Sequence, residues 1–376
     1  MNHIAIVLPG IDPTGGAENQ ALLIAREMAK RGWRITVIAM SGSGGEAGSA
    51  LLRDGISFFS LNMRKGFIDP GGWTQFRRWL RMHKPDVVHS HLPHATWLAR
   101  WSRLLTPTRV QLDTFHSYSI GPSSRQLAYR LTRAIPSCVT AVSKAVEKSH
   151  VDAKLVDEDR FLLIPNGIDT ERWKPDSSAR EEIRGRLGLR DEFLWLAVGR
   201  LEPVKDYPTS LQALARLDES VHLAIAGDGT LNAPLRRLAH QLGIDARVHF
   251  LGFVQDPLRW LQGADGFVLA SQWEGLPIAL LEAAACALPV VATDVPGTWD
   301  IVTHGQNGLL AVAGSVDALA SAMQRLIEMP QTDRQSLGER ARETVMEQND
   351  LNRVMDKWHA LYTTLLEQND KPLRHG

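Results

Sequence analysis

Cysteine is scarce in this sequence, and long apolar runs are missing. The 376 residues include two cysteines, Cys138 and Cys286, which lie far apart and lack the spacing of metal ligands. This argues against a disulfide framework and against a cysteine-based zinc site. No apolar segment approaches the roughly 18 residues needed to span a bilayer, and the N-terminus lacks the basic region and cleavage site of a secretory signal. We therefore expect a cytoplasmic protein.

Net charge is also lacking, because 42 Lys and Arg residues balance 42 Asp and Glu residues. The balance is uneven along the chain, with 21 basic and 14 acidic residues in 1–170 and 21 basic and 28 acidic residues in 171–376. Such a split can mark a surface that meets anionic partners. An independent drift in charge between two domains explains it equally well.

Short apolar runs alternate with amphipathic helical patterns, which is the rhythm of βαβ units. The length and the 44% hydrophobic content suit two globular domains. Uninterrupted apolar strands indicate parallel sheets that are covered on both faces. We predict two doubly wound α/β domains joined by the turn-rich segment 165–175, and a loop at the Gly/Ser-rich segment 41–49. The expected strands are 4–8, 34–39, 87–89, 110–112, 139–142, 161–164, 193–198, 221–226, 248–250, 266–270 and 290–293.

Two loops carry groups that suit a phosphate. Gly15 and Gly16 precede a helix, where backbone N–H groups and the positive end of the helix dipole can face an anion; a tight turn is the alternative. Arg200 and Lys205 follow the first strand of the second domain, at the sheet edge where open α/β sheets bind ligands. Two such cations fit a diphosphate, and a solvated surface pair is the alternative.

The segment 271–282 contains the strongest local signal. Glu274 lies in the loop after a strand, and Glu282 lies one to two turns into the next helix among apolar residues. A carboxylate in such surroundings is costly unless it accepts hydrogen bonds, and sugar or ribose hydroxyls are natural donors. The start of this helix, which can also face a phosphate, comprises Gly275, Leu276, Pro277 and Ile278.

In chain order these motifs resemble the family-4 (GT4), retaining, nucleotide-sugar-dependent glycosyltransferases of the GT-B fold. Further matches include His89-Ser90-His91, Val142-Ser143-Lys144, Asn166-Gly167-Ile168-Asp169, Ala226-Gly227-Asp228-Gly229, Asn307-Gly308 and the E-x7-E spacing of Glu274 and Glu282. The resemblance covers nearly the whole chain. It implies two Rossmann-like doubly wound domains facing a central cleft. Residues 1–168 would bind the acceptor and 169–351 the donor, with a C-terminal helix at about 352–376 packing back on the first domain.

The resemblance also implies roles for individual residues. Arg200 and Lys205 would neutralise the donor diphosphate. Glu282 would bind the ribose hydroxyls and Glu274 the hydroxyls of the transferred sugar. Gly16, with Gly15 before it, would lie beside the diphosphate, and Val254 would border the nucleobase. His116 would lie near the reacting sugar. His91 and His94 are candidate contacts to the acceptor. The family retains anomeric configuration, and its proposed displacement needs no enzymic nucleophile. No metal or cofactor is expected.

Asp157-Glu158-Asp159 matches the D-x-D pattern of metal-dependent GT-A transferases. A GT-A metal motif follows a strand, whereas this one precedes the strand predicted at 161–164. We therefore expect a solvated turn without a metal ion. Among the other histidines, His89 is expected to pack in the interior and His304 to lie in a loop.

Aromatic and basic residues are interleaved between residues 72 and 84. Trp73, Phe76 and Leu80 share one helical face, and the neighbouring face carries Arg77, Arg78, Arg81 and Lys84. This composition suits the headgroup zone of an anionic membrane. The alternative is that the rings pack on the sheet. Nucleic acid is not an expected partner, because no recognition motif accompanies the charge.

We therefore expect a transferase that moves a hexose-type sugar from a nucleotide diphosphate sugar, with UDP favoured, to a hydroxyl of a lipid-linked or polysaccharide acceptor. The expected setting is bacterial cell-envelope glycan synthesis, with possible peripheral association at the cytoplasmic face of the inner membrane. The alternatives are a GDP-mannose-dependent mannosyltransferase, a transferase to a small soluble acceptor, and a catalytically silent module that binds sugar nucleotides. A nicotinamide-dependent dehydrogenase is disfavoured because no G-x-G-x-x-G follows a strand.

Overall fold

A computed structural model describes residues 1–11, 15–64 and 69–370. It divides into two compact units. Unit 1 comprises Met1–Gly167 together with the residues from Asn352 onward, and unit 2 comprises Ile168–Leu351. Thr14 of the first glycine loop and residues 371–376 of the predicted C-terminal helix lie outside the described residues.

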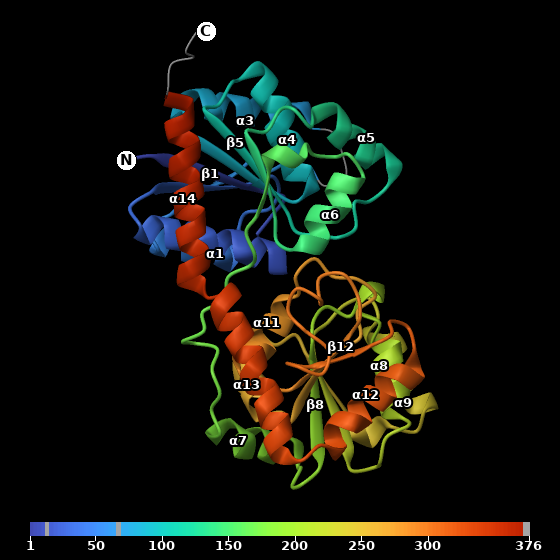
Figure 1. Cartoon of the computed structure of the whole chain (residues 1–376). Coiled ribbons are helices and arrows are strands. Elements are labelled where there is room, and N and C mark those ends of the chain that lie inside the picture. Colours follow the sequence, from blue (N-terminus) through green and yellow to red (C-terminus); the bar gives the residue numbers. More distant parts are fainter. Residues whose placement is uncertain (12–14, 65–68, 371–376) are drawn as a thin grey trace. The chain divides into compact units, whose positions relative to one another are not determined.

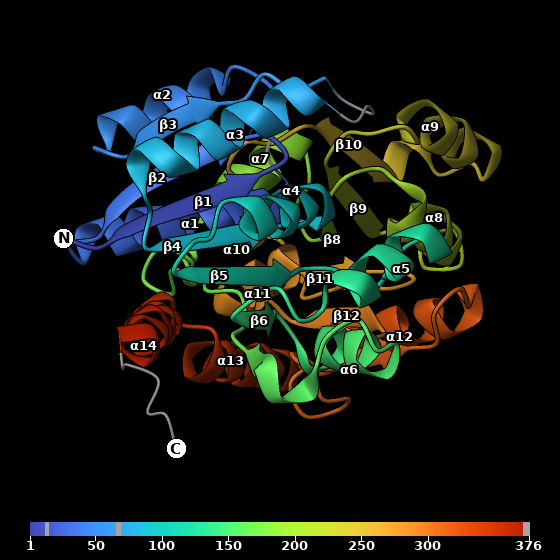
Figure 2. The same cartoon turned by 90° about the horizontal axis from the view of Figure 1, so that it is seen from above.

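The described part of unit 1 is built on a seven-stranded parallel sheet in the order β3-β2-β1-β4-β5-β6-β7 (Figure 2). Its inner strand β1 is buried along its whole length, as expected where helices cover both faces. The strands are β1 (His3–Leu8), β2 (Arg34–Ala39), β3 (Ser57–Ser60), β4 (Val87–His91), β5 (Val110–Phe115), β6 (Cys138–Ala141) and β7 (Phe161–Leu163).

Helices connect these strands in the manner of repeated βαβ units. Helix α1 is stabilised at both ends by its own sequence. Gly15 caps it in an extended conformation, and Glu18 in the first turn and Lys30 in the last turn complement the helix dipole. The helices of unit 1 are α1 (Gly16–Lys30), α2 (Gly45–Arg53), α3 (Pro70–His83), α4 (Pro93–Leu105), α5 (Ser123–Thr132), α6 (Lys144–Asp152) and the short 3₁₀ turn η1 (Glu158–Arg160).

The last helix, α14 (Leu351–Asp370), packs on unit 1 (Figure 1). The Tyr362 hydroxyl lies 2.7 Å from Nδ1 of His89, and the Trp33 indole N–H donates to Nδ1 of His359 at 3.0 Å. Trp358 and Tyr362 are buried. Helix α14 therefore completes the core of unit 1.

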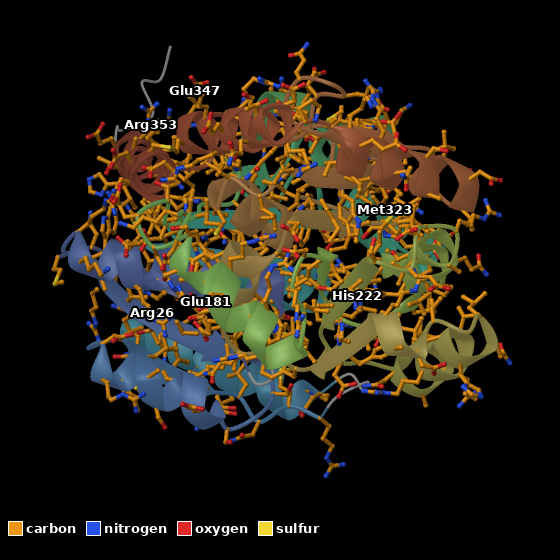
Figure 3. The ribbon with its side chains drawn as sticks, turned by 90° about the horizontal axis from the view of Figure 1, so that it is seen from below. Arg26, Glu181, His222, Met323, Glu347 and Arg353 are labelled. Atoms are coloured by element: carbon orange, nitrogen blue, oxygen red, sulfur yellow. The ribbon has the colours of Figure 1, made fainter. Side chains whose placement is uncertain are left out.

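The described part of unit 2 is built on a six-stranded parallel sheet in the order β10-β9-β8-β11-β12-β13. Its core combines Trp195 and Leu223 from the strands with Met323 from a covering helix (Figure 3). The strands are β8 (Phe193–Val198), β9 (Val221–Ala226), β10 (Val248–Gly252), β11 (Gly266–Leu269), β12 (Val290–Thr293) and β13 (Leu309–Ala311). The helices are α7 (Ser178–Leu187), η2 (Pro203–Lys205), α8 (Tyr207–Leu214), α9 (Asn232–Gln241), η3 (Asp245–Arg247), α10 (Leu258–Gly263), α11 (Ile278–Ala285), α12 (Val316–Glu328) and α13 (Gln331–Gln348).

Each sheet reverses its strand order once, and such a switch point opens a crevice at the carboxyl ends of the strands. In unit 1 the switch lies between β1 and β4, so it is flanked by the Gly15–Gly16 turn and by His91. In unit 2 it lies between β8 and β11, which are followed by Arg200 and by Glu274. The topology thus brings the residues singled out in each unit to that unit's binding edge.

The predicted pair of doubly wound α/β domains is confirmed, with three local differences. The segment 41–49 is not a loop throughout, because α2 begins at Gly45 and packs Gly48 and Leu51 inward, with Gly48 against the Phe58 ring. The edge strands β3 and β13 were not expected, and they are four and three residues long. In the described ranges, none of the helices has the length and apolar character to cross a bilayer.

Candidate functional site

The binding edge of unit 2 holds a close ion pair between two of the predicted residues. Lys205 ends the η2 turn after β8, and Glu274 lies in the loop after β11. Lys205 Nζ donates to Glu274 Oε1 at 2.6 Å, and the two side chains are 20% and 12% exposed. The Ser271 hydroxyl donates to the same oxygen at 2.6 Å. Because both contacts use Oε1, Oε2 is the oxygen placed to accept a further hydroxyl.

Backbone hydrogen bonds fix the loops that carry this pair. The amide of Gln272 donates to the carbonyl of Val204 at 2.8 Å, which ties the Glu274 loop to the Lys205 loop. The amide of Glu274 donates to the carbonyl of Pro296 at 3.1 Å. Gly297 follows with φ +88, and a Cβ there would lie 2.7 Å from the carbonyl oxygen of Glu274. Only glycine fits this close approach, so the turn after β12 supports the loop of the ion pair.

A second glycine packs the ends of β8 and β9 together. A Cβ on Gly227 would lie 1.9 Å from the carbonyl oxygen of Gly199, closer than any side chain can approach. The amide of Gly199 donates to the carbonyl of Ala226 at 3.0 Å, and Tyr207 donates its hydroxyl to the carbonyl of Gly199 at 3.0 Å. These contacts set the direction of the chain just before Arg200, whose side chain is exposed.

Glu282 occupies the fifth position of α11, on the same binding edge. Burial raises the pKa of its carboxyl group to about 8 from the ordinary 4.5; the nearby Arg172 guanidinium lowers it and Asp256 raises it. Arg172 and Asp256 form an ion pair of 2.9 Å with each other. A carboxyl group with this pKa is poorly solvated, and hydroxyl donors from a ligand would stabilise its ionised form.

The other residues predicted for donor binding lie on loops at the same edge. Gly275 and Leu276 continue the Glu274 loop, Pro277 caps α11 in an extended conformation and Ile278 begins the helix. Val254 is partly exposed in the loop after β10. Two supporting residues escaped sequence reasoning, Ser271 and Gly297. A serine two residues after a strand and a Pro-Gly turn are common features, so neither stands out in the sequence. Ser271 contacts Glu274 within its own loop, and Gly297 contacts it from the turn after β12.

The residues predicted in unit 1 gather at its own switch point. Gly15 and Gly16 form the cap and first residue of α1 after β1. His116 follows β5 and is partly exposed, and its Nε2 lies 2.9 Å from Nδ1 of His91. His91 ends β4 with no exposed surface, whereas His94 is exposed in the first turn of α4. His89 is fully buried, as expected.

The aromatic rings of the stretch at 72–84 pack against the core of unit 1, Phe76 within it and Trp73 partly buried at its edge. Phe76 is fully buried, and the Trp73 indole N–H donates to the Ser102 hydroxyl at 2.9 Å. Arg77 lies over the Trp73 ring and donates to the Thr106 hydroxyl. The structure therefore favours the packing alternative for Trp73 and Phe76.

Acidic residues at Asp157-Glu158-Asp159 form the end of a loop and the η1 turn before β7. Asp157 pairs with Arg133 at 3.3 Å. Across the described segments, no three His, Cys, Asp or Glu side chains converge as they would around a metal ion.

Comparisons with known proteins give the class that this fold and these sites define. The family model described as "Glycosyltransferase Family 4" matches residues 14–172, and the model described as "Glycosyl transferases group 1" matches residues 179–344. Together they span most of both units. The chain belongs to the family-4 glycosyltransferases of the GT-B fold, and it is a glycosyltransferase enzyme.

Individual relatives show the range of that family. The chain is 28% identical over 265 residues to the UDP-Gal:alpha-D-GlcNAc-diphosphoundecaprenol alpha-1,3-galactosyltransferase of Escherichia coli, covering 66% of this chain and 68% of that protein. It is 33% identical over 245 residues to a GDP-mannose-dependent alpha-(1-6)-phosphatidylinositol monomannoside mannosyltransferase of Mycobacterium tuberculosis, covering 61% and 63%. The crystal structure of Anabaena HepE in complex with UDP and glucose matches with a TM-score of 0.87, 21% identity, and coverage of 97% and 100%.

Proposed function

We propose that this glycosyltransferase moves a hexose from a nucleotide diphosphate sugar, with UDP as the favoured nucleotide, to a hydroxyl of a lipid-linked or polysaccharide acceptor, with retention of anomeric configuration. The observation that carries the proposal is the Lys205–Glu274 pair of 2.6 Å at the switch point of unit 2, with Arg200 and Glu282 on the same edge. This set offers two cations for a diphosphate and two carboxyl groups for hydroxyls.

The chemistry asks little of the protein beyond charge and position. The bond between the anomeric carbon and the diphosphate oxygen breaks, and the acceptor oxygen bonds to that carbon on the same face. The departing diphosphate takes the acceptor proton, so neither an enzymic nucleophile nor a metal ion is part of the proposal. Lys205 and Arg200 stabilise the negative charge that develops on the diphosphate. Glu274 accepts hydrogen bonds from hydroxyls of the transferred sugar, and Glu282 accepts hydrogen bonds from the ribose hydroxyls.

The choice of donor and acceptor is supported by the relatives. The E. coli relative is named for a UDP-sugar donor and a diphosphoundecaprenol-linked acceptor, and the HepE structure contains UDP and glucose. The M. tuberculosis relative is named for GDP-mannose and a phosphatidylinositol acceptor. A GDP-mannose-dependent mannosyltransferase is therefore the second candidate. Bacterial cell-envelope glycan synthesis is the setting that the lipid-linked acceptors favour.

A panel of nucleotide sugars tests the donor assignment. UDP-sugars are expected to raise the melting temperature of the whole chain more than GDP-mannose does, because a ligand that binds the folded state stabilises it. Glu282→Ala should abolish this shift for every donor if Glu282 binds the ribose. Glu181→Gln on the exposed face of α7 (Figure 3) is the control that should keep it. A larger shift with GDP-mannose would select the second candidate, and no shift with any donor would contradict the proposal.

We also propose that unit 1 associates with anionic membranes, through α4 rather than through Trp73 and Phe76. Trp101, Leu104 and Leu105 share the outer face of α4 and are 46%, 55% and 55% exposed. Residues 70–146 contain eleven Lys and Arg residues and two acidic residues, Asp86 and Asp113. Asp113 and Arg100 are fully buried in an ion pair with each other, and Asp86 pairs with Arg109, so the segment keeps a net positive charge. Exposed apolar side chains among cations suit the headgroup region of an anionic bilayer.

Vesicle sedimentation tests this surface. The protein is expected to bind vesicles containing phosphatidylglycerol, and the binding should weaken with added salt because the cations of unit 1 are screened. Replacing Trp101 and Leu105 together by alanine should weaken binding about tenfold, which corresponds to about 1.4 kcal/mol of lost apolar burial. Trp299→Ala, at an exposed tryptophan of unit 2, is the matched control. Binding that survives the double substitution would refute the assignment to α4.

A further inference from the structure

The side chains of His91 and His116 bond directly to each other. His91 ends β4, His116 follows the neighbouring strand β5, and Nδ1 of His91 lies 2.9 Å from Nε2 of His116. The register pairs His91 with Thr114, and His116 lies two residues beyond Thr114, just past the end of β5. This is a contact between a fully buried histidine and a partly exposed one at the carboxyl ends of β4 and β5.

Both rings are neutral at physiological pH. Burial lowers the pKa of His116 to about 4, and it lowers the pKa of His91 well below its ordinary value. The neighbouring rings of His89 and His116 lower the pKa of His91 further. In a hydrogen bond between two neutral imidazoles, one nitrogen donates its proton and the other accepts with its lone pair. The tautomers of His91 and His116 are therefore coupled.

The other nitrogen of His91 decides between the two coupled states. Nε2 of His91 is buried without a hydrogen-bond partner. If His116 donated from Nε2, His91 would carry its own proton on Nε2 as a buried N–H with nothing to accept it. If His91 donates from Nδ1, its Nε2 is a bare lone pair. Buried N–H groups without an acceptor are rarer in proteins than under-satisfied acceptors, so the second state is favoured.

The rings behind His91 hold it in place. His89 packs on His91 with a centroid distance of 4.0 Å. Nδ1 of His89 lies 2.7 Å from the Tyr362 hydroxyl, and its Nε2 lies 2.7 Å from the Thr114 hydroxyl. Thr114 in turn bonds to Thr140 at 2.7 Å. Because both nitrogens of His89 are hydrogen-bonded, its ring is held in one orientation and limits the rotation of the His91 ring that packs on it.

We propose that His91 is a positioning residue that holds His116 as the Nδ1–H tautomer, so that His116 presents an N–H donor, and not a base, at the binding edge of unit 1. With Nε2 of His116 occupied by His91, the nitrogen left to meet a ligand is Nδ1, which carries the proton. That the ligand atom is a sugar or acceptor oxygen rests on the proposed function. The same arrangement leaves no lone pair on His116 for taking the acceptor proton, which agrees with a diphosphate that takes it.

Nitrogen NMR of the full chain labelled with ¹⁵N-histidine tests the tautomers directly and needs no substrate. The signals are assigned by their loss in His116→Gln and His91→Asn. In the wild type, His116 is expected to carry its proton on Nδ1, while its unprotonated Nε2 accepts the hydrogen bond from His91. His91 is expected to carry its proton on Nδ1. His91→Asn, whose amide nitrogen can take the place of Nδ1, should leave the His116 tautomer unchanged. His91→Leu should shift His116 toward the Nε2–H form.

Finding the proton of His116 on Nε2 in the wild type would overturn the proposal, and so would a tautomer that His91→Leu leaves unchanged. If His91→Leu does not fold, the wild-type and His91→Asn spectra still decide, because both must show Nδ1–H. In steady-state assays, His91→Leu should lower kcat about ten- to hundredfold and His91→Asn less than about threefold, in line with one misdirected hydrogen bond. A wild type that transfers no sugar from any nucleotide donor would refute the proposed function and leave the spectra to judge this inference separately.

Discussion

Lys205→Ala is expected to lower kcat for sugar transfer by about 10²–10³, the loss seen when one group that stabilises transition-state charge is removed. The side chain of Lys205 is 20% exposed, and its amine is held 2.6 Å from Glu274 on loops that are tied together by backbone hydrogen bonds. It is therefore preorganised, and its charge is poorly screened by water. Steady-state kinetics with the donor that the thermal panel selects would measure the loss.

The neighbouring carboxylate sharpens this test. In Lys205→Ala, the carboxylate of Glu274 remains beside the proposed site of the diphosphate and opposes the negative charge that develops there. Lys205→Ala combined with Glu274→Gln removes that repulsion, so the double variant should lose less turnover than the product of the two single losses. Lys174→Ala, at an exposed lysine of unit 2, is the control. Near wild-type kcat in Lys205→Ala would rule out its role at the diphosphate.

Glu282→Gln is expected to make unit 2 more stable at pH 8.5 and to remove part of the pH dependence of unfolding. Because folding raises the pKa of this carboxyl group from 4.5 to about 8, the folded protein keeps a proton that the unfolded chain releases. The free energy of unfolding of the wild type therefore falls as the pH rises through this range, by up to about 1.4 kcal/mol per pH unit from this group. Glutamine has the same shape but does not titrate, so it makes no pH-dependent contribution to the free energy of unfolding.

Urea unfolding of the wild type and of Glu282→Gln between pH 5 and 8.5 would measure this difference. The stability of the variant relative to the wild type should rise steadily with pH, while contributions from all other groups cancel in the comparison. Glu181→Gln, at an exposed position of the same unit, should show a constant difference. A difference for Glu282→Gln that does not change with pH would contradict a raised pKa.

The central architecture follows from local sequence, whereas the edges of the sheets do not. Strands β1 and β8 are continuous apolar runs, because both faces of a parallel sheet are covered, and they were predicted at 4–8 and 193–198. Strand β3 is four residues long with two serines, and β13 is three residues long, so neither has a pattern of its own. Helix α2 contains Gly45 and Gly48, and packing against Phe58 outweighs its low intrinsic propensity.

For the candidate site, too, part of the arrangement could be predicted from the sequence and part could not. Residue types and spacing indicate that Arg200, Lys205, Glu274 and Glu282 belong to one edge, because the carboxyl ends of parallel strands share it. They do not show that Lys205 and Glu274 touch, since that contact depends on how two loops fold against each other. Nor do they show that His91 is buried, because a histidine at a strand end can face either way. The packing of Trp73 likewise depends on α4, which supplies Ser102.

The placement of α14 in unit 1 has a consequence for synthesis on the ribosome. Domains generally fold in the order in which they emerge, but the core around His89 and Trp33 lacks Tyr362 and His359 until α14 has left the exit tunnel. Unit 2, which is continuous from Ile168 to Leu351, can complete its fold before then. The first unit to be translated is thus the last to be finished. A released chain that is truncated after Leu351 should therefore be cleaved by protease in its N-terminal half, while its C-terminal half, which contains all of unit 2, resists cleavage.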